Sequence, residues 1–412
     1  MRPTTELFLL IEFLDEFIYG AREAAWPLIR ADFGLSYAQI GLLLSLPSFV
    51  SGVAEPLIGV LGDTWRRRLL ILGGGTVFAL ALLLTALSRT YALLLLAFTV
   101  FSPASGAFVN LAQATLMDLA PNRRERNMAR WTFAGSLGVV MGPIALGAAV
   151  ALALGWRAVF GFTAVAALSV VVYAGWTRRP ASGDPAPQAS VASAPVSAVP
   201  HEMAVTVAPH PSSLIAGLQG AVRALRRPDV LRWLTLLQFS DLMLDILLGY
   251  LALYLVDVAG VTTARASTAV AIWTGVGLVG DLLIIRLLAR YDGLRYLRLS
   301  AVSELVLFSA FLLLPGLPAK LVALGLLGLF NAGWYAILKA QLYAVLPGQS
   351  GTAMAVSNLF GLLGSLIPLA LGAIAQRWGL SATMWCLTLG PIALLVGLPT
   401  SSSASMSDVV PD

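Results

Sequence analysis

About twelve apolar stretches divide this chain, and no other feature limits its fold as strongly. Each is close to the roughly 20 residues that a helix needs to cross the hydrocarbon core of a bilayer. None shows the strict alternation of apolar and polar residues that marks a membrane barrel. Hydrophobic residues make up 58% of the chain, and the mean hydropathy is +0.85. The sequence therefore predicts an all-α integral membrane protein with twelve transmembrane helices.

The arginines between these stretches favour one orientation. With the N-terminus inside, clusters at 66–68, 123–126, 223–227 and 290–298 face the cytoplasm, whereas the opposite loops hold mostly single basic residues. The positive-inside rule then places both termini in the cytoplasm. We expect the chain in the plasma membrane, which in a bacterium is the inner membrane. The net charge of +5 follows from these clusters and does not indicate a nucleic-acid partner.

A change of composition after the sixth stretch separates two halves. From Thr177 the chain is rich in Pro, Ala and Ser, as linkers are. The end of this segment, Ser212 to Pro228, has apolar residues on one helical face beside arginines, which predicts a short amphipathic helix on the membrane surface. We expect residues 1–176 to form an N-terminal six-helix bundle, 177–228 a cytoplasmic linker, 229–400 a C-terminal six-helix bundle, and 401–412 a cytoplasmic tail.

The two halves share an internal repeat. A constant shift of 226 residues aligns several positions from the first helix into the fifth of each half. The aligned pairs are Phe13 and Phe239, Asp15 and Asp241, Gly34 and Gly260, Glu55 and Asp281, Pro121 and Pro347, Met128 and Met354, and Gly138 and Gly364. Because two of these pairs join acids within apolar stretches, the repeat indicates a duplicated bundle.

The first stretch contains "IEFLDEFIYGARE", Ile11 to Glu23, which is unusually rich in charge for a membrane helix. Each charged residue at mid-bilayer costs about 2.5 to 3.5 kcal/mol on insertion scales, so these side chains must face the protein interior. Glu12, Glu16, Tyr19 and Glu23 recur at spacings of 4, 3 and 4 and form one helical stripe. In a two-bundle protein such a stripe would line a central cavity.

Further ionisable residues lie within other apolar stretches and could face the same cavity. Neighbouring carboxylates withdrawn from water retain protons more readily than isolated ones, so they could carry protons near neutral pH. The alternative is that each acid forms a buried ion pair or hydrogen bond that stabilises the bundle. We expect the substrate and proton site to include Asp15, Glu16, Tyr19, Arg22, Glu23, Glu55, Asp241, Asp281 and Lys339.

Two motifs resemble those of the major facilitator superfamily. "GVLGDTWRRR", Gly59 to Arg68, is similar to that family's loop between the second and third helices. "GSLGVVMGPIALG", Gly135 to Gly147, is similar to its exporter motif in the fifth helix. The fourth stretch, Tyr91 to Phe108, lacks the arginine that proton-coupled exporters of the family commonly carry. The resemblance implies roles in gating for Gly59, Asp63, Arg67, Arg68, Asp118, Gly138, Gly142 and Pro143.

This resemblance implies a secondary transporter that works by alternating access, loosely similar to the drug-efflux and fosmidomycin-resistance permeases. The acids favour proton-coupled export of a small cationic or amphipathic molecule. A proton-driven uptake symporter of a metabolite and a divalent cation transporter remain alternatives. No nucleophile and base pair, cofactor motif or metal set is evident, so we expect no enzyme activity, cofactor or bound metal. The expected partners are a small-molecule substrate, protons and the lipid bilayer, with the chain acting as a monomer.

Overall fold

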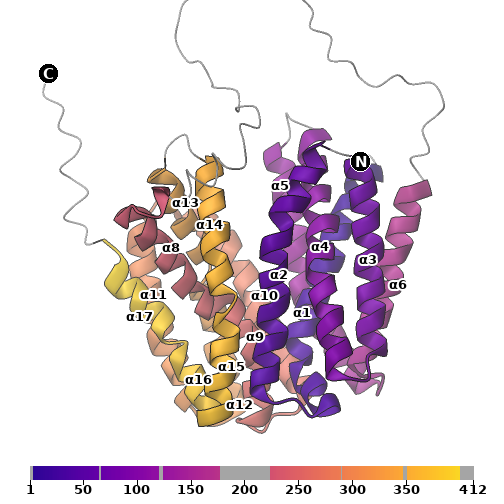
Figure 1. Cartoon of the computed structure of the whole chain (residues 1–412). Coiled ribbons are helices and arrows are strands. Elements are labelled where there is room, and N and C mark those ends of the chain that lie inside the picture. The colour runs from indigo at the N-terminus through magenta and orange to yellow at the C-terminus, as the bar shows by residue number, and fades with distance from the viewer. Residues whose placement is uncertain are drawn as a thin grey trace, which may run out of the picture.

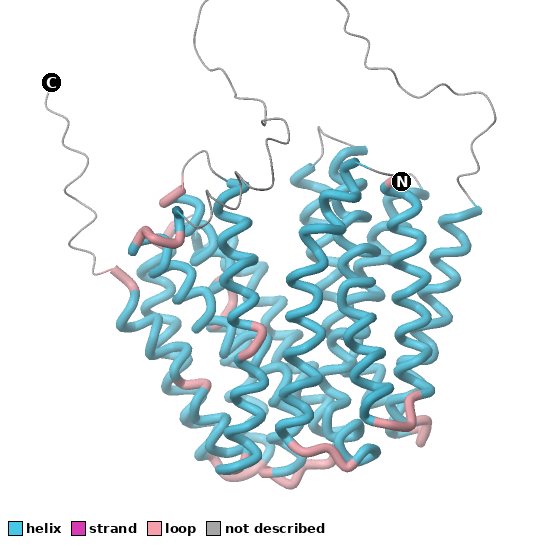
Figure 2. The backbone as a smooth tube through the Cα atoms, in the orientation of Figure 1, coloured by secondary structure: helices cyan, strands magenta, loops and turns pink. Residues whose placement is uncertain are grey.

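The computed structural model describes residues 3–64, 66–119, 124–176, 223–288, 290–346 and 350–399. Within these ranges every regular element is helical, and the helices stand side by side in two groups (Figure 1 and Figure 2). The first group contains α1 (Pro3–Phe33), α2 (Tyr37–Thr64), α3 (Arg67–Leu87), α4 (Tyr91–Leu119), α5 (Arg124–Ala151) and α6 (Gly155–Trp176). All six are uninterrupted.

The second group is built from helices that are more often broken. Its elements are α8 (Pro228–Asp241), the π-helical turn η2 (Leu242–Ile246), α9 (Leu247–Asp257), α10 (Thr263–Leu288), α11 (Gly293–Leu313), α12 (Leu317–Phe330), α13 (Trp334–Ala344), α14 (Ser350–Gly364), α15 (Ile367–Trp378), α16 (Leu380–Cys386) and α17 (Leu389–Gly397). Only α10 and α11 run from one end of the bundle to the other as single helices.

Eleven of the described helical segments are long and apolar enough to cross a membrane. Helix α1 has 31 residues and is also long enough, but its charged residues keep it out of that set. Adding α1 gives the twelve spans predicted from the sequence, and the all-α membrane fold is confirmed. The feature that makes α1 exceptional is therefore charge and not length.

Both halves reverse direction in the same way after their first span. Gly34 follows α1 with φ +62°, and its repeat mate Gly260 follows α9 with φ +67°. A left-handed residue after a helix suits glycine, which has no Cβ to clash. The repeat detected in the sequence thus reappears as matching backbone geometry.

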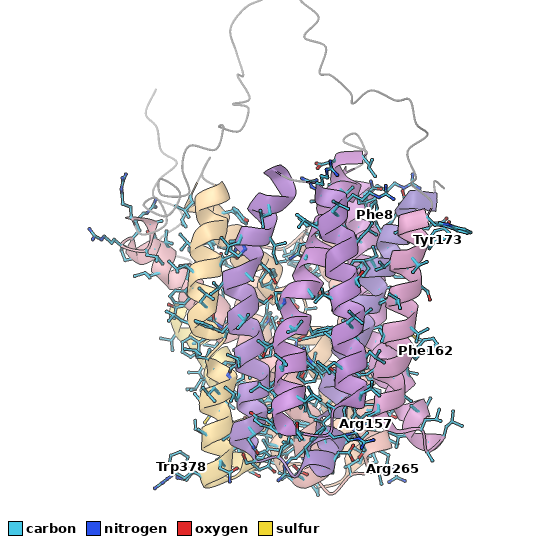
Figure 3. The ribbon with its side chains drawn as sticks, turned by 45° about the vertical axis from the view of Figure 1, so that its right-hand side comes forward. Phe8, Arg157, Phe162, Tyr173, Arg265 and Trp378 are labelled. Carbon is cyan, nitrogen blue, oxygen red and sulfur yellow. The ribbon has the colours of Figure 1, made fainter. Side chains whose placement is uncertain are left out.

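We call the end where α1 begins and α17 ends the terminal end, and the opposite end the far end (Figure 1). The outer surface between them is apolar. Phe162 is 70% exposed near mid-height, and Trp378 is 65% exposed at the far end (Figure 3). Tyr173 lies toward the terminal end on α6. Aromatic residues near both ends with apolar side chains between them fit a surface that faces lipid.

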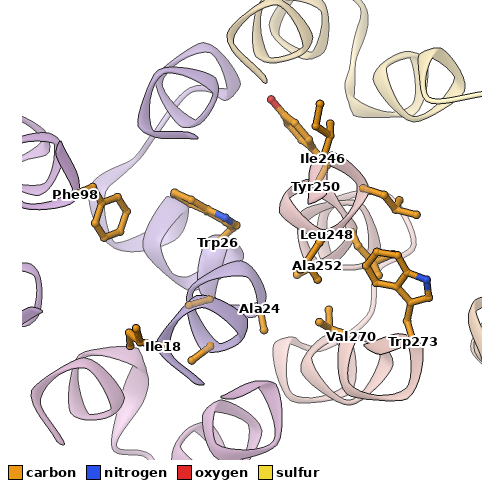
Figure 4. Packing of buried hydrophobic residues seen from close by; sticks show 14 of the residues in the cluster. Ile18, Ala24, Trp26, Phe98, Ile246, Leu248, Tyr250, Ala252, Val270 and Trp273 are labelled. Carbon is orange, nitrogen blue, oxygen red and sulfur yellow. The ribbon is translucent and has the colours of Figure 1, made fainter. Parts of the chain in front are cut away.

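The two bundles pack together mainly through three helix pairs, namely α2 with α15, α5 with α10, and α1 with α9. Ala24 of α1 faces Ala252 of α9 across the interface, and both are fully buried (Figure 4). Trp26 lies on the other side of α1, in edge-to-face contact with Phe98. Small residues between helices allow close backbone approach where lipid supplies no hydrophobic driving force for association.

Hydrogen bonds join the bundles at the far end. Arg30 Nη1 lies 2.7 Å from Asp257 Oδ2, and the Tyr37 hydroxyl donates to the same oxygen at 3.0 Å. The Leu369 amide donates to Ser45 Oγ at 2.8 Å. We call Arg30, Tyr37 and Asp257 the far-end latch, because these residues tie α1 and α2 to α9. Toward the terminal end the two groups of helices diverge (Figure 1).

Several sequence-based expectations fall outside the described residues. Most of the linker, with nearly all of its expected amphipathic helix, lies in 177–222, and the tail lies in 400–412. The side chain of Asp63 is also outside the described part. The domain boundaries therefore stay predictions.

Candidate functional site

Adjoining chambers lie between the bundles and form one central cavity. An acidic chamber of about 470 Å³ is bounded mainly by α1, α2 and α4, and it continues into a smaller space of about 350 Å³ toward α5. A mixed chamber of about 440 Å³ lies against the second bundle. Tyr19, Arg22 and Asp245 line both main chambers, so these residues mark where the two meet.

The acidic chamber holds two acids with polar partners. Ser105 Oγ donates to Asp15 Oδ1 at 2.7 Å. Ser51 Oγ donates to Glu55 Oε1 at 2.6 Å, and Asn110 Nδ2 donates to Glu55 Oε2 at 3.4 Å. These neighbours are neutral, so they orient the two carboxyl groups without neutralising them. Both acids remain free to exchange a proton or to face a cation.

Glycines of α5 allow α1 to bring its acids into this chamber. A methyl group on Gly135 would lie 2.6 Å from Glu12 Oε1, and one on Gly138 would lie 2.6 Å from the Phe13 carbonyl oxygen. One on Gly142 would overlap the Phe17 carbonyl oxygen. The exporter-like motif is thus the surface on which α1 packs. Pro143 belongs to the same contact, because its ring lies near Gly20.

The mixed chamber contains a buried charge pair. Arg22 donates to Glu23 Oε1 from Nε at 2.9 Å and from Nη2 at 2.6 Å. Trp26 Nε1 donates to Glu23 Oε2 at 2.7 Å, and Glu23 is only 2% exposed. Arg22 is therefore matched by its own neighbour, and the other acids of the cavity lack this compensation.

Residues related by the repeat meet where the bundles join. Tyr19 OH donates to Asp245 Oδ1 at 3.1 Å, and these positions are 226 residues apart. Gly249 is the repeat mate of Glu23, and a methyl group there would lie 3.3 Å from Glu23 Oε2. The relation predicted from the sequence therefore describes a pseudo-twofold arrangement that passes through the cavity.

The second bundle contributes Asp241, Asp245 and Lys339 to the mixed chamber. Lys339 Nζ donates to Ser357 Oγ at 2.9 Å and lies 5.7 Å from the centre of the Tyr335 ring. In total, seven carboxylates (Glu12, Asp15, Glu16, Glu23, Glu55, Asp241 and Asp245) and two basic groups (Arg22 and Lys339) line the three chambers.

Asp281 lies elsewhere. It lines a neighbouring cavity of about 960 Å³ that is bounded mainly by α5, α10 and the start of α13, which we call the lateral cavity. Asp281 Oδ1 accepts a hydrogen bond from the Gly333 amide at 3.2 Å, where the chain unwinds between α12 and α13. The structure thus brings together eight of the nine expected site residues and separates the ninth.

The loop motif lies at the terminal end of the first bundle. Arg67 Nη1 is 2.6 Å from Asp118 Oδ2, which joins the start of α3 to the end of α4. Arg68 donates to the carbonyl oxygens of Ala174 and Gly175 at the end of α6. Gly59 lies in α2, and a methyl group there would meet nothing within 4 Å. These contacts hold the first bundle together at this end.

Sequence reasoning missed three features. The π-helical turn Leu242–Ile246 has no signal in periodicity. The serine partners of Asp15 and Glu55 would have required knowing which helices are neighbours. Glu304 of α11 is fully buried, and neither of its carboxylate oxygens has a hydrogen-bond partner in the described part of the chain. An isolated acid inside an apolar stretch was the available signal for Glu304.

No group of three or more acidic, histidine or cysteine side chains among the described residues could hold a metal ion. The arrangement instead consists of carboxylates around chambers of about 350 to 470 Å³, with one arginine that is compensated by Glu23. Such a cavity can bind cations and hold protons.

A polytopic helical bundle with ionisable groups gathered between two repeats defines a membrane transporter and not an enzyme. The family model of the Major Facilitator Superfamily matches residues 8–368. The chain belongs to the Major Facilitator Superfamily.

Curated relatives match over part of their length. An uncharacterised MFS-type transporter of Yersinia pestis is 39% identical over 114 residues, which is 26% of this chain and 29% of that protein. A chloramphenicol resistance protein of Pseudomonas aeruginosa is 31% identical over 140 residues, or 34% of this chain and 33% of that protein. The chain thus matches about a third of the length of these relatives.

Solved structures match over the whole fold. A bacterial homologue of the human lysosomal transporter Spinster, in an inward-facing and occupied conformation, has a TM-score of 0.69 at 15% identity and covers 96% of this chain and 93% of its own. The nucleoside transporter NupG has a TM-score of 0.72 at 13% identity, with 96% and 98% covered. At these identities the similarity concerns the fold alone.

Proposed function

We propose that this protein exports a small cationic or amphipathic molecule in exchange for protons. The observation that carries the proposal is the imbalance of charge in the central cavity, where seven carboxylates face two basic groups. Because Glu23 already compensates Arg22, the remaining acids can attract a cation or hold protons in its place. Competition between proton and cation for the same carboxylates is the physical basis of exchange.

The proposed orientation puts the terminal end in the cytoplasm. The arginine-rich segments meet at this end, as the positive-inside rule requires. The far-end latch then closes the outer side, and the cavity receives substrate from the cytoplasm. Release outside would require the latch to open and the terminal ends of the bundles to approach each other, which is alternating access.

The partial similarity to chloramphenicol resistance proteins supports a role in efflux. The match covers only 33% and 36% of the length of those proteins. The proposed substrate class is therefore argued from the residues of the cavity. A cavity whose charged residues are mainly carboxylates favours cations over neutral or anionic compounds.

Ethidium accumulation by energised inverted membrane vesicles tests the proposal. We expect wild-type vesicles to take up ethidium and a protonophore to abolish uptake. Asp15→Asn should lower the initial rate at least about tenfold, since a carboxylate in direct contact with proton or cation contributes on the order of 1.4 kcal/mol or more.

The matched control is Asp229→Asn. Asp229 pairs with Arg227 at the start of α8, outside the cavity, so the initial rate should stay near the wild-type value. Uptake that survives Asp15→Asn and Glu55→Gln unchanged would contradict the proposal.

A further inference from the structure

The lateral cavity lies where α5 and α10 separate. Toward the far end the two helices touch: a methyl group on Gly275 would lie 3.7 Å from Val140 Cγ1, and one on Gly147 would lie 3.7 Å from Ser267 Cβ. Toward the terminal end the helices part, and the lateral cavity of about 960 Å³ fills the space between them. The seam between α5 and α10 is therefore closed toward the far end and open toward the terminal end.

The rim of the lateral cavity is apolar and exposed. Phe133 of α5 is 53% exposed and Leu282 of α10 is 54% exposed. At a seam between two membrane-spanning helices, exposed apolar side chains of this kind suit contact with lipid acyl chains. A molecule dissolved in the bilayer can thus reach this cavity from the side.

One charge distinguishes the cavity from a plain apolar groove. Asp281 is the only charged residue among the described residues that line it, and Tyr335, which is 58% exposed, belongs to the same wall. A carboxylate beside an aromatic ring in an apolar recess suits an organic cation with hydrophobic substituents. An anionic amphiphile would meet repulsion from Asp281 without a compensating basic group.

The lateral cavity adjoins the central one. Leu244 and Tyr335 line both the lateral cavity and the mixed chamber. Leu244 belongs to the π-helical turn η2 and is followed directly by Asp245, which lines the central cavity. A cation that passes these two side chains moves from one carboxylate to the next.

We propose that the lateral cavity is a portal through which amphipathic organic cations leave the inner leaflet, contact Asp281, and pass between Leu244 and Tyr335 into the central cavity. This inference rests on the proposed function and on the orientation given with it. It also accounts for the repeat mate of Glu55 lying outside the central cavity.

Cysteine labelling can detect a ligand in the portal without measuring transport. Cys386 is the only cysteine of the chain, so Cys386→Ala provides a cysteine-free background. Ser136→Cys then reports on the lateral cavity, and Ser48→Cys reports on the central cavity. Ile144→Cys is the matched control, because Ile144 is on the same helix, is 47% exposed, and does not line the cavity.

The probes are tetraphenylphosphonium and tetraphenylborate, which share shape and size but have opposite charge. In proteoliposomes treated with a bilayer-soluble maleimide, we expect the phosphonium to slow labelling of Ser136→Cys about tenfold and to leave Ile144→Cys unchanged. Adding Asp281→Asn should raise the phosphonium concentration needed for protection about tenfold, equal to about 1.4 kcal/mol. The borate should not protect.

The other outcomes separate the two proposals. Protection of Ser48→Cys without protection of Ser136→Cys would overturn the portal and leave the proposed function standing. Protection of neither residue would overturn both. Equal protection of Ser136→Cys by the borate would overturn the selectivity for cations. If Ser136→Cys does not fold, Thr132→Cys, which also lines the lateral cavity, replaces it.

Discussion

Glu55 and Asp281 occupy the same position in the two halves of the repeat, yet their surroundings differ. Glu55 faces the central cavity and bonds Ser51 and Asn110, whereas Asp281 faces the lateral cavity and bonds the Gly333 amide. The helix opposite each acid explains the difference. Helix α4 runs unbroken past Gly106, which touches Glu55, but the equivalent span of the second half is broken between α12 and α13.

This comparison shows that the duplication and the helix breaks determine different properties of the two acids. The duplication places an acid at the same depth in both bundles. The break in the second bundle leaves the Gly333 N–H group without a partner in its own helix, and this group donates to Asp281. The hydrogen bond holds Asp281 at the seam between α5 and α10. The second bundle contains further interruptions, the π-helical turn η2 among them, and such turns are frequent at functional sites. We therefore expect the first bundle to act as the more rigid partner.

The largest expected effect concerns the two repeat-related glycines of the fifth and eleventh spans. Gly138→Ala would place a methyl group 2.6 Å from a backbone oxygen of α1, whereas Gly364→Ala would meet the end of the Gln238 side chain. Backbone cannot move aside without separating the helices, so Gly138→Ala should lower the unfolding free energy by about 3 kcal/mol. Gly364→Ala should cost much less because Gln238 can rotate.

Thermal unfolding of the purified variants in detergent measures this difference. The control is Gly161→Ala in α6, where a methyl group would meet nothing within 4 Å. Equal melting temperatures for Gly138→Ala and Gly364→Ala would contradict the packing described for α1 and α5.

A second, smaller effect separates the two repeat-related acids. Glu55→Gln should lower transport of every cationic substrate about tenfold, or about 1.4 kcal/mol, because Glu55 lines the central cavity. Asp281→Asn should affect only the lipophilic substrates that use the portal. The test compares initial transport rates of tetraphenylphosphonium and of a hydrophilic cation such as tetramethylammonium in each variant. A uniform loss in both variants would remove the distinction between the two acids.

The smallest effect concerns the far-end latch. Asp257→Asn weakens the contact with Arg30 across the bundles, whereas Asp32→Asn weakens a pair with Arg157 inside the first bundle. The Arg30–Asp257 pair is partly exposed, so its contribution should be near the 0.2–1 kcal/mol of exposed ion pairs, or about a threefold shift in population. Asp257→Asn should favour the outward-open state, and Asp32→Asn should not.

Distances between spin labels on α2 and α15 at the far end report this shift directly. An increase in the wide-distance population for Asp257→Asn alone is the expected result. If both variants behave alike, the latch does not control the opening of the far end.

Much of this architecture follows from local sequence patterns. Apolar length predicted the spans, and the stripe of acids in the first helix predicted the face that α1 turns toward the cavity, because helical periodicity is a local property. The constant offset of 226 residues aligned Gly34 with Gly260, and both adopt a positive φ after the first span of their half. These features need no knowledge of which helices become neighbours.

The position of Asp281 could not be predicted in this way. It depends on the break at Asn331–Gly333 in another span, where Gly333 adopts φ +76°. Nothing at Asp281 itself distinguishes it from Glu55. The hydrogen bonds of Asp15 to Ser105 and of Tyr19 to Asp245 likewise join residues 90 and 226 positions apart. Contacts of this kind arise from tertiary packing, which a one-dimensional pattern does not contain.

Proton movement during cation entry into proteoliposomes tests the central claim most directly. Wild-type protein and Asp15→Asn are reconstituted with a pH-sensitive dye inside, with equal pH on both sides and the membrane potential clamped. When ethidium is added outside, the proposal predicts that the lumen becomes alkaline in proportion to cation uptake in the wild type and not in Asp15→Asn. Cation uptake with an acidified or unchanged lumen would contradict proton exchange.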